Sequence, residues 1–584
     1  MDIEDLSSFD GNSVFETDLV IVGGGPAGLT IAREFFGSSV RVLVLESGLR
    51  EESPDYAALA EVESIGEPNT GLQKRKRKLF HGASASLWSQ ELQPYGVRCR
   101  ALGGSTHAWA GKSAAFDTID FASRPWIPNS GWPITRELLD PYLDRAAEVL
   151  NLGPNCYDDG LWKLIGIKPP EPRLDAEGLR SFFWQFARSR VDHLDFMRFG
   201  REFLTFEADN VRVLLNATAR QIELSTDGSR FEGLEISTID GVRSRVRAKM
   251  AVIAASGIEN PRLLLASKSV QAAGIGNGRD LVGRFLMGHA GARVGRFELA
   301  DVPAMLKRFG FYGVRHAGRT QMYMHGLALS GEFQEREQLL NSAVYFLPER
   351  SPDNPWDALK RLLQRSSVKP LGDLFSVLSG AGLIAKGIGM KVLASPATPA
   401  AAKDFIVNTA IRYSPNLVVE EFQNRGLPHK LAGLWIDAIT EQRPDPDSRV
   451  TLADRTDRLG VPLARVNWRI RDDERRTIVR IAELACQAFA RAGLPRPVLE
   501  AWVAEKRLAD GVIIDMAHTL GTTRMSDDPS SGVVDANCRV HGVRGLYVAG
   551  ASVFPTSGHA NPTLMILALA IRLADTIKGQ LAGR

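Results

Sequence analysis

The start of the chain alternates short apolar runs with a glycine turn. Residues 18–22 (DLVIV) are apolar and β-branched and stop at glycines, which is typical of a buried parallel strand. Residues 29–36 have helical spacing, and residues 40–45 (VRVLVL) form a second apolar run. Strand, glycine turn, helix and strand make one βαβ unit, so this part of the chain predicts a Rossmann-like domain.

Two later parts of the chain show a similar pattern of strand and helix. Residues 250–255 (MAVIAA) predict a strand that leads into a helix at 261–267. Residues 545–550 (GLYVAG) predict another strand, and residues 564–577 a helix. Because this late strand also ends at glycine, we expect the chain to return to its first domain.

The middle of the chain is less regular. Residues 211–222 and 234–239, with the turn Asp227-Gly228 between them, predict a hairpin, and residues 290–297 alternate as a strand does. The most apolar segment, residues 374–385, is too short to cross a bilayer and predicts a buried or interfacial helix.

Composition limits the class of protein. With 584 residues, 44% hydrophobic and 24% charged, the sequence predicts a globular protein of two domains. A net charge of +3 does not indicate binding to nucleic acid. We interpret the basic run at residues 74–78 as a solvated loop.

The four cysteines form no CxxC pair, so no metal site is expected, and a reducing compartment is favoured. The acidic N-terminus does not resemble a secretory signal, so we expect a cytoplasmic protein.

A glycine-rich turn follows the first strand. Gly23, Gly25 and Gly28 stand at GxGxxG spacing, which allows a tight turn, the approach of a pyrophosphate and close packing of the helix. Glu46 ends the second strand, 46 − 28 = 18 residues later, where a carboxylate accepts hydrogen bonds from ribose hydroxyls. The turn predicts dinucleotide binding without separating FAD from NAD(P).

Four further stretches resemble the GMC (glucose–methanol–choline) oxidoreductases. They are HTLGTTRMSDDP with the sequence that follows it to residue 575, LGGSTHAWAG at 102–111, ASGIENPR at 255–262, and VGRF at 282–285. The ending NPT at 561–563 and the stretch THAW at 106–109 favour the sugar-oxidising branch, which includes pyranose oxidases and sugar 3-dehydrogenases.

The resemblance implies an α/β fold. A Rossmann-like domain with a parallel sheet would bind extended FAD, and a second α+β domain, built on an antiparallel sheet, would bind the substrate. We expect the FAD-binding domain at residues 1–290, with substrate-side segments near 110–200, the substrate-binding domain at 291–505, and a return to the first domain at 506–584. The further residues that the resemblance assigns to FAD are Gly104, Ser105, His107, Ala219, Gly257, Gly550, Ala551 and Thr563. Among them Ala219 would lie near the adenine, and Gly550-Ala551 would face the flavin ring.

Alcohol oxidation needs a base that takes the hydroxyl proton while a hydride leaves carbon for the flavin. The resemblance assigns this base to His518, which opens the H-x-x-G-T motif, and a second contact with the same oxygen to Asn561. His559 is a second candidate for the role given to Asn561. His289 and His541 are interpreted as structural.

One histidine could carry the flavin covalently. In pyranose oxidases a T-H-W histidine is linked to the flavin, but here Ala108 separates His107 from Trp109, so the sequence leaves this linkage open.

The favoured function is FAD-dependent oxidation of a secondary alcohol on a sugar, glycoside or similar polyol, with oxygen, a quinone or a redox protein as acceptor. One alternative is a flavoprotein lyase on the same fold. Another is a catalytic subunit docked on a membrane electron-transfer partner through the basic stretch 356–391, although a lid over the active site is the preferred interpretation of that stretch.

Overall fold

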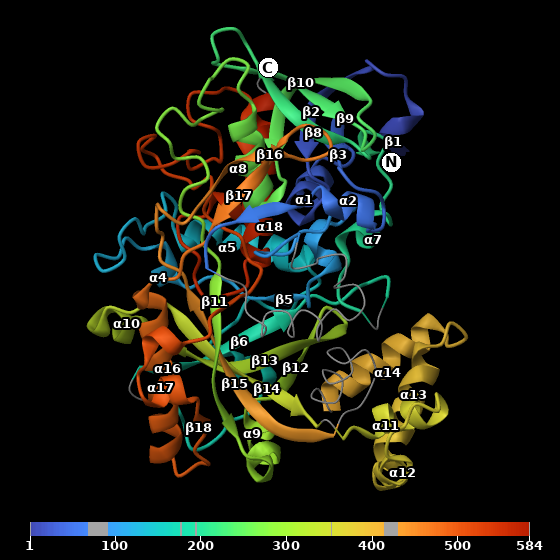
Figure 1. The fold of residues 1–584 in the computed structure, drawn as a ribbon, viewed down its shortest axis with the longest axis vertical. Helices are drawn as coiled ribbons and strands as arrows, with labels where there is room; N and C mark the ends of the chain where they lie inside the picture. Colours follow the sequence, from blue (N-terminus) through green and yellow to red (C-terminus); the bar gives the residue numbers. More distant parts are fainter. Residues whose placement is uncertain are drawn as a thin grey trace.

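A computed structural model describes residues 2–67, 92–175, 178–192, 195–351, 353–413 and 430–582. The basic run at residues 74–78 lies outside the described residues. Figure 1 shows a sheet with its helices in the upper half of the molecule and a second, larger sheet in the lower half. The cavity described below lies between these two sheets.

The upper sheet has eight strands in the order β1-β7-β3-β2-β10-β9-β8, with β20 paired to β10. Its parallel strands are β1 (Asp2–Asp5), β2 (Val14–Val22), β3 (Val42–Leu45), β7 (Val211–Leu215), β10 (Arg243–Ile253) and β20 (Leu546–Val548). The last four residues of β2 are buried, as the apolar run predicts. Because β20 pairs with β10, the end of the chain joins the sheet begun by its first residues.

The predicted hairpin is wrong in its first half. Residues 211–222 form two strands, of which β7 joins the parallel sheet beside β3, and only β8 (Thr218–Leu224) pairs with β9 (Phe231–Ser237) as a hairpin. Asn216 lies between β7 and β8 with φ 54°, so the chain turns there through the left-handed region. The alternation of apolar residues continues across this turn and hides it in the sequence.

The lower sheet has nine strands, and all of its pairings are antiparallel. Its main path is β18 (Val498–Leu499), β11 (His289–Phe297), β15 (Leu431–Glu441), β14 (Ser342–Arg350), β13 (Arg319–Leu329), β6 (Leu179–Phe186) and β5 (Lys112–Ser113). β12 (Phe311–His316) pairs with β13, and β19 (Ile514–Asp515) with β11. The fold is therefore α/β, with a Rossmann-like domain and a second domain built on an antiparallel sheet.

Helices cover both sheets. In the upper half, α1 (Pro26–Glu34) and α5 (Arg136–Val149) pack against α18 (Thr563–Ala582). In the lower half, α16 (Asp472–Arg491) packs on β11, β14 and β15. A three-stranded sheet of β16 (Arg449–Thr456), β17 (Pro462–Asn467) and β4 (Val62–Ser64) contacts α8 (Ser256–Ala266). Shorter helices are α2 (Pro54–Ala58), α4 (Thr118–Phe121), α6 (Gly160–Ile165), α7 (Phe199–Phe203), α9 (Val302–Arg308), α10 (Gly331–Glu337) and α17 (Ala501–Ala504).

Four helices between β14 and β15 project from the side of the lower half (Figure 1). These insertion helices are α11 (Pro355–Leu363), α12 (Pro370–Ser379), α13 (Ala381–Ala394) and α14 (Ala400–Tyr413). The single helix predicted at residues 374–385 is wrong, because α12 and α13 meet there at Gly380 with a bend of 71°. In the described chain no single helix has the length and apolar character to span a membrane, and this bent pair meets that test only as a pair.

Candidate active site

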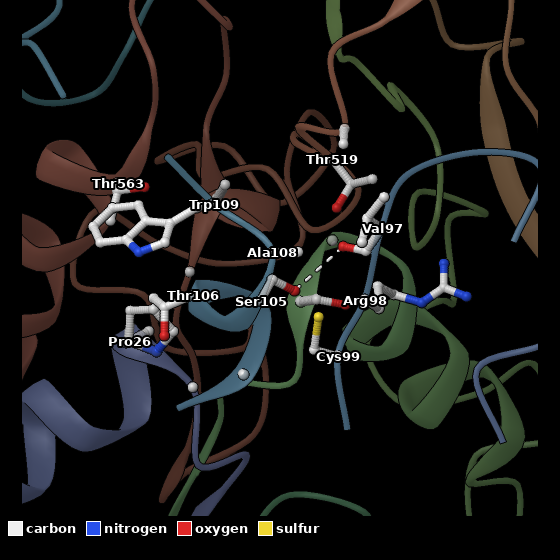
Figure 2. A pocket seen from close by; sticks show the side chains of 18 of the residues that line it. Pro26, Val97, Arg98, Cys99, Ser105, Thr106, Ala108, Trp109, Thr519 and Thr563 are labelled. Atoms are coloured by element: carbon white, nitrogen blue, oxygen red, sulfur yellow. Dashed lines mark hydrogen bonds between the residues drawn. The ribbon is translucent and has the colours of Figure 1, made fainter. Parts of the chain in front are cut away.

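One cavity of about 590 Å³ lies between the two sheets and is lined by both. Its walls come from the glycine turn before α1, the segment from Val97 to Ala110, α8, the lower sheet and the chain after Met516. Figure 2 shows Pro26 of α1, Ser105 and Trp109 of the middle segment, and Thr519 and Thr563 of the C-terminal part around it. The predicted site residues line this cavity, except for Gly28 and the alternative candidate His559.

The three glycines of the turn serve different steric needs. Gly23 has φ 110°, and a Cβ there would lie 2.6 Å from the carbonyl oxygen of Ala254. A Cβ on Gly28 would meet the carbonyl oxygen of Gly23, so this glycine allows α1 to pack on the turn. Gly25 differs, because a Cβ there would meet only the Cα of Gly104 at 3.9 Å and would otherwise enter the cavity.

Glu46 stands at the end of β3, beside the turn. Its two carboxylate oxygens accept hydrogen bonds from the amides of Gly24 (3.0 Å) and Gly48 (2.8 Å). Burial raises the pKa of Glu46. The side chain is thus fixed at the cavity wall, at the position where the sequence predicts a contact with ribose.

Cationic side chains that the sequence analysis did not select also line the cavity near the turn. Arg100 forms an ion pair of 3.1 Å with Glu259, and Arg98 one of 3.6 Å. Burial alone would raise the pKa of Glu259, but Arg100, Arg262 and Arg98 hold it at about 2. Arg262 also pairs with Asp457 at 2.7 Å, so these three guanidinium groups face two carboxylates on this part of the cavity wall.

The segment around Ser105 is held by hydrogen bonds. Ser105 Oγ donates to the carbonyl of Val97 at 3.2 Å (Figure 2), and His107 Nε2 lies 3.0 Å from the carbonyl oxygen of Leu102. Arg198 donates to the carbonyls of Thr106 (2.5 Å), His107 (3.1 Å) and Trp109 (3.2 Å). The covalent link at His107 stays a prediction from the sequence.

The cavity meets the needs of FAD in its shape. Gly550 has φ 98°, and a Cβ on it would find nothing within 4 Å, so the backbone there borders open space. Gly257 is packed against the carbonyl of Thr519, which brings α8 close to the segment of His518. Ala219, Ala551 and Thr563 complete the predicted lining. A cavity that runs from the glycine turn to His518 matches an extended dinucleotide whose reactive ring lies at the far end.

His518 lies at that far end with its tautomer set by His289. The Nδ1 atoms of the two rings are 2.7 Å apart, and His289 Nε2 lies 3.0 Å from the carbonyl oxygen of Ser557. Because a carbonyl only accepts, Nε2 of His289 carries a proton; burial lowers the pKa of this histidine to about 4, so its Nδ1 is bare and accepts. His518 must therefore donate from Nδ1, which leaves its Nε2 unprotonated.

His518 is neutral at pH 7. Burial, with the positive charge of Lys112, lowers the pKa of His518 well below its usual value. Its Nε2 lies 3.4 Å from the Nδ2 of Asn561, and the Oδ1 of Asn561 has no hydrogen-bond partner among the described residues. The unprotonated Nε2 of His518 thus accepts a long hydrogen bond from the Asn561 carboxamide, and both groups lie on the cavity wall.

His559, the other candidate for the role of Asn561, does not line the cavity. Its side chain is fully buried, it packs against the ring of Phe182 with centroids 4.5 Å apart, and burial lowers its pKa to about 3. Nδ1 of His559 lies 3.9 Å from a carboxylate oxygen of Asp117. This histidine supports the loop that carries Asn561 and does not face the space beside His518.

Lys112 of β5 is a cavity residue that the sequence analysis missed. Its Nζ lies 4.1 Å from the ring centroid of Trp184 and 3.9 Å from that of Tyr345, and burial lowers its pKa to about 7. The sequence signal for Lys112 is weak, because a single lysine at the start of a short strand belongs to no motif. His289 was missed for a similar reason: it was interpreted as structural, and no spacing links it to His518, 229 residues away.

Comparisons with known proteins agree with this geometry. Residues 444–570 match the family model of the GMC oxidoreductases. The chain is 26% identical to the 2-methyl-1,2-propanediol dehydrogenase of Mycolicibacterium austroafricanum, over 97% of this chain and 96% of that protein. It is 23% identical to the fructose dehydrogenase large subunit of Gluconobacter japonicus, over 98% and 99% of the two chains.

The fold also has solved counterparts. An FAD-dependent oxidoreductase from Chaetomium thermophilum superposes with a TM-score of 0.54 at 17% identity, covering 97% of this chain and 100% of that one. At this identity the likeness concerns the fold.

Proposed function

We propose that this member of the GMC oxidoreductases oxidises a secondary alcohol to a ketone, and that the alcohol belongs to a sugar, glycoside or similar polyhydroxy compound. The chain is an FAD-dependent enzyme that acts on CH–OH groups. The observation that carries the proposal is the pair formed by His518 Nε2 and Asn561 Nδ2, 3.4 Å apart at the cavity wall. The electron acceptor is left open.

Each member of the pair has one task. A substrate hydroxyl that faces both nitrogens replaces the contact between them: it donates its hydrogen to the unprotonated Nε2 of His518, while its oxygen accepts from Nδ2 of Asn561. When the carbon–oxygen double bond forms, the proton stays on Nε2 and the Nδ1 proton remains in the hydrogen bond to His289. The hydrogen bonds fix the oxygen and thereby orient the C–H bond. Bound FAD supplies the electrophile, N5 of its flavin, that accepts the hydride.

A polyhydroxy substrate is favoured by the polar groups beyond this pair. Lys112 Nζ lies in the same cavity between Trp184 and Tyr345, where an ammonium or amine can hydrogen-bond a second hydroxyl of the substrate. Of the two rings, Tyr345 lines the cavity and offers the apolar contact that one face of a sugar ring makes. A simple alcohol would leave this part of the cavity without a partner.

The test is anaerobic reduction of the bound flavin at pH 7 by a panel of compounds. We expect sugars and glycosides to bleach the flavin absorbance at least about tenfold faster than primary alcohols or simple diols at equal concentration, which corresponds to the loss of one good hydrogen bond. The product should be a ketone by mass and by carbonyl derivatisation. Preference for a simple diol would overturn the substrate class, and absence of bleaching by every alcohol, with conversion of an alcohol to a non-oxidised product, would favour a lyase.

His289 is a positioning residue for this reaction. Replacing it by alanine removes the acceptor that holds the Nδ1 proton of His518, so the ring is free to rotate and to adopt the other tautomer. We expect the rate of flavin reduction to fall roughly a hundredfold with FAD content unchanged. Stopped-flow absorbance under anaerobic conditions measures the rate.

The conservative variant separates positioning from packing. In His289→Asn the side-chain oxygen can accept from His518 Nδ1, and we expect it to recover a large part of the rate lost in His289→Ala. Equal rates in both variants, or a wild-type rate in the alanine variant, would show that His289 does not set the tautomer.

A further inference from the structure

The insertion helices α11–α14 and the loops between them hold the most exposed large apolar side chains of the described residues. The eight most exposed large apolar side chains of the described residues all lie in them or in the loops between them, from Val368 at 91% to Val392 at 63%. Outside residues 355–413 none exceeds the 59% of Ile65. A concentration of this kind marks an interaction surface.

Helix α12 exposes its apolar face, whereas a helix that covers a soluble core buries that face. Its apolar residues share one face at i, i+3, i+4 and i+7 spacing: Leu371, Leu374, Phe375 and Leu378, exposed by 84%, 47%, 73% and 68%. Its buried residue is Asp373, whose carboxylate accepts from Arg361 Nε at 3.0 Å and from Ser367 Oγ at 2.6 Å. The polar side of α12 therefore faces the protein, and its apolar side faces outward.

Among the insertion helices, α14 packs on the lower sheet. Helix α14 buries Val407 and Ile411 and contacts β12 and β13. Asn408 Oδ1 accepts from the amide of Thr320 at 3.1 Å. No described residue of 355–413 lines the cavity, so the preferred interpretation of this stretch as a lid is not supported by the structure. The outward apolar face is thus held in place away from the active site.

The charges around this face have one predominant sign. Residues 355–413 contain eight Lys or Arg and three Asp. The exposed basic residues are Lys360, Arg365, Lys369, Lys391 and Arg412, whereas the exposed acid is Asp357 alone among the described residues of this range. A segment whose exposed side chains are apolar or mostly basic suits a surface that is apolar inside and anionic at its rim.

We propose that the insertion helices dock the enzyme on the surface of an anionic phospholipid bilayer, with the outward face of α12 and the loop before it buried in the interface. A second copy of the chain fits less well, since a self-complementary contact would bring the five exposed cations of each face together. Anionic lipid is typical of the cytoplasmic leaflet, so the proposal accords with the cytoplasmic location expected from the sequence. The proposed docking on the bilayer does not depend on which substrate the enzyme oxidises.

Vesicle flotation of the purified, flavin-loaded enzyme tests the proposal. We expect it to float with phosphatidylcholine vesicles that contain phosphatidylglycerol at low ionic strength, and to float less as salt is raised or when phosphatidylglycerol is left out. The double variant Val368→Glu/Leu371→Glu should lose vesicle binding at least about tenfold. Its dye-coupled activity in solution should stay at the wild-type level, because neither residue lines the cavity.

A matched control pair lies at the end of α6 and just after it. Leu164 and Ile167 have the same spacing and are exposed by 52% and 46%, so Leu164→Glu/Ile167→Glu adds the same charge elsewhere and should bind vesicles as wild type does. Wild-type protein that does not float at low salt overturns the proposal, as does a Val368/Leu371 variant that floats unchanged. Dimers in solution that only this variant abolishes, without vesicle binding, would assign the face to a second copy.

Discussion

His518→Ala is expected to keep its FAD and to lose about a thousandfold in the rate of flavin reduction by substrate, the contribution typical of a positioned base. The ring is fully hydrogen-bonded at Nδ1 and bare at Nε2, so alanine removes the proton acceptor and leaves the glycine turn, more than 400 residues away along the chain, untouched. Flavin content from the absorbance spectrum and the reduction rate from anaerobic stopped-flow measure the two effects separately.

His541 offers the matched control. It hydrogen-bonds the carbonyl of Ser526 at 2.9 Å through Nε2 and does not line the cavity, so His541→Ala should reduce its flavin at the wild-type rate. If His518→Ala were reduced as fast as the control, another group would have to be the base. Loss of FAD from His518→Ala would point to a role in holding the cofactor instead.

The parts of the fold that the sequence predicted are those with local signals. The βαβ unit at the N-terminus follows from apolar runs that end at glycines, and Gly23, Gly25 and Glu46 line the cavity at one end. His518 and Asn561 were selected through a family motif, and the structure brings them within 3.4 Å although 43 residues separate them. In both cases the relevant residues belong to one continuous stretch.

What the sequence could not predict depends on contacts between distant stretches. His289 begins β11 and reaches His518 only because the bridge between Met287 and Leu520 aligns the two segments. Lys112 enters the cavity because β5 forms the edge of a sheet whose other strands come from much later in the chain. The apolar residues of α12 predict burial by their composition, and only the position of Asp373 shows that their face is outward.

Gly25→Val is expected to yield folded but colourless protein, with affinity for FAD lowered by at least about a hundredfold. Gly25 is the suitable member of the turn to test, since it has φ −85° and a Cβ on it would meet only the Cα of Gly104, at 3.9 Å. The valine side chain would instead occupy the cavity where the second glycine admits a pyrophosphate. At Gly23 the same change would strain the backbone, so loss of flavin there would have no clear cause.

Gly278→Val provides the control, because Gly278 is exposed and a Cβ on it would find nothing within 4 Å. Both variants should show the circular dichroism of a folded protein, but added FAD should raise the melting temperature of the control and not that of Gly25→Val, since a ligand stabilises only the protein that binds it. Stoichiometric flavin in Gly25→Val would mean that the pyrophosphate does not approach this turn. The assignment of the two ends of the cavity would then have to be reversed or abandoned, because the position of His518 at the reactive end follows from the phosphates lying at Gly25.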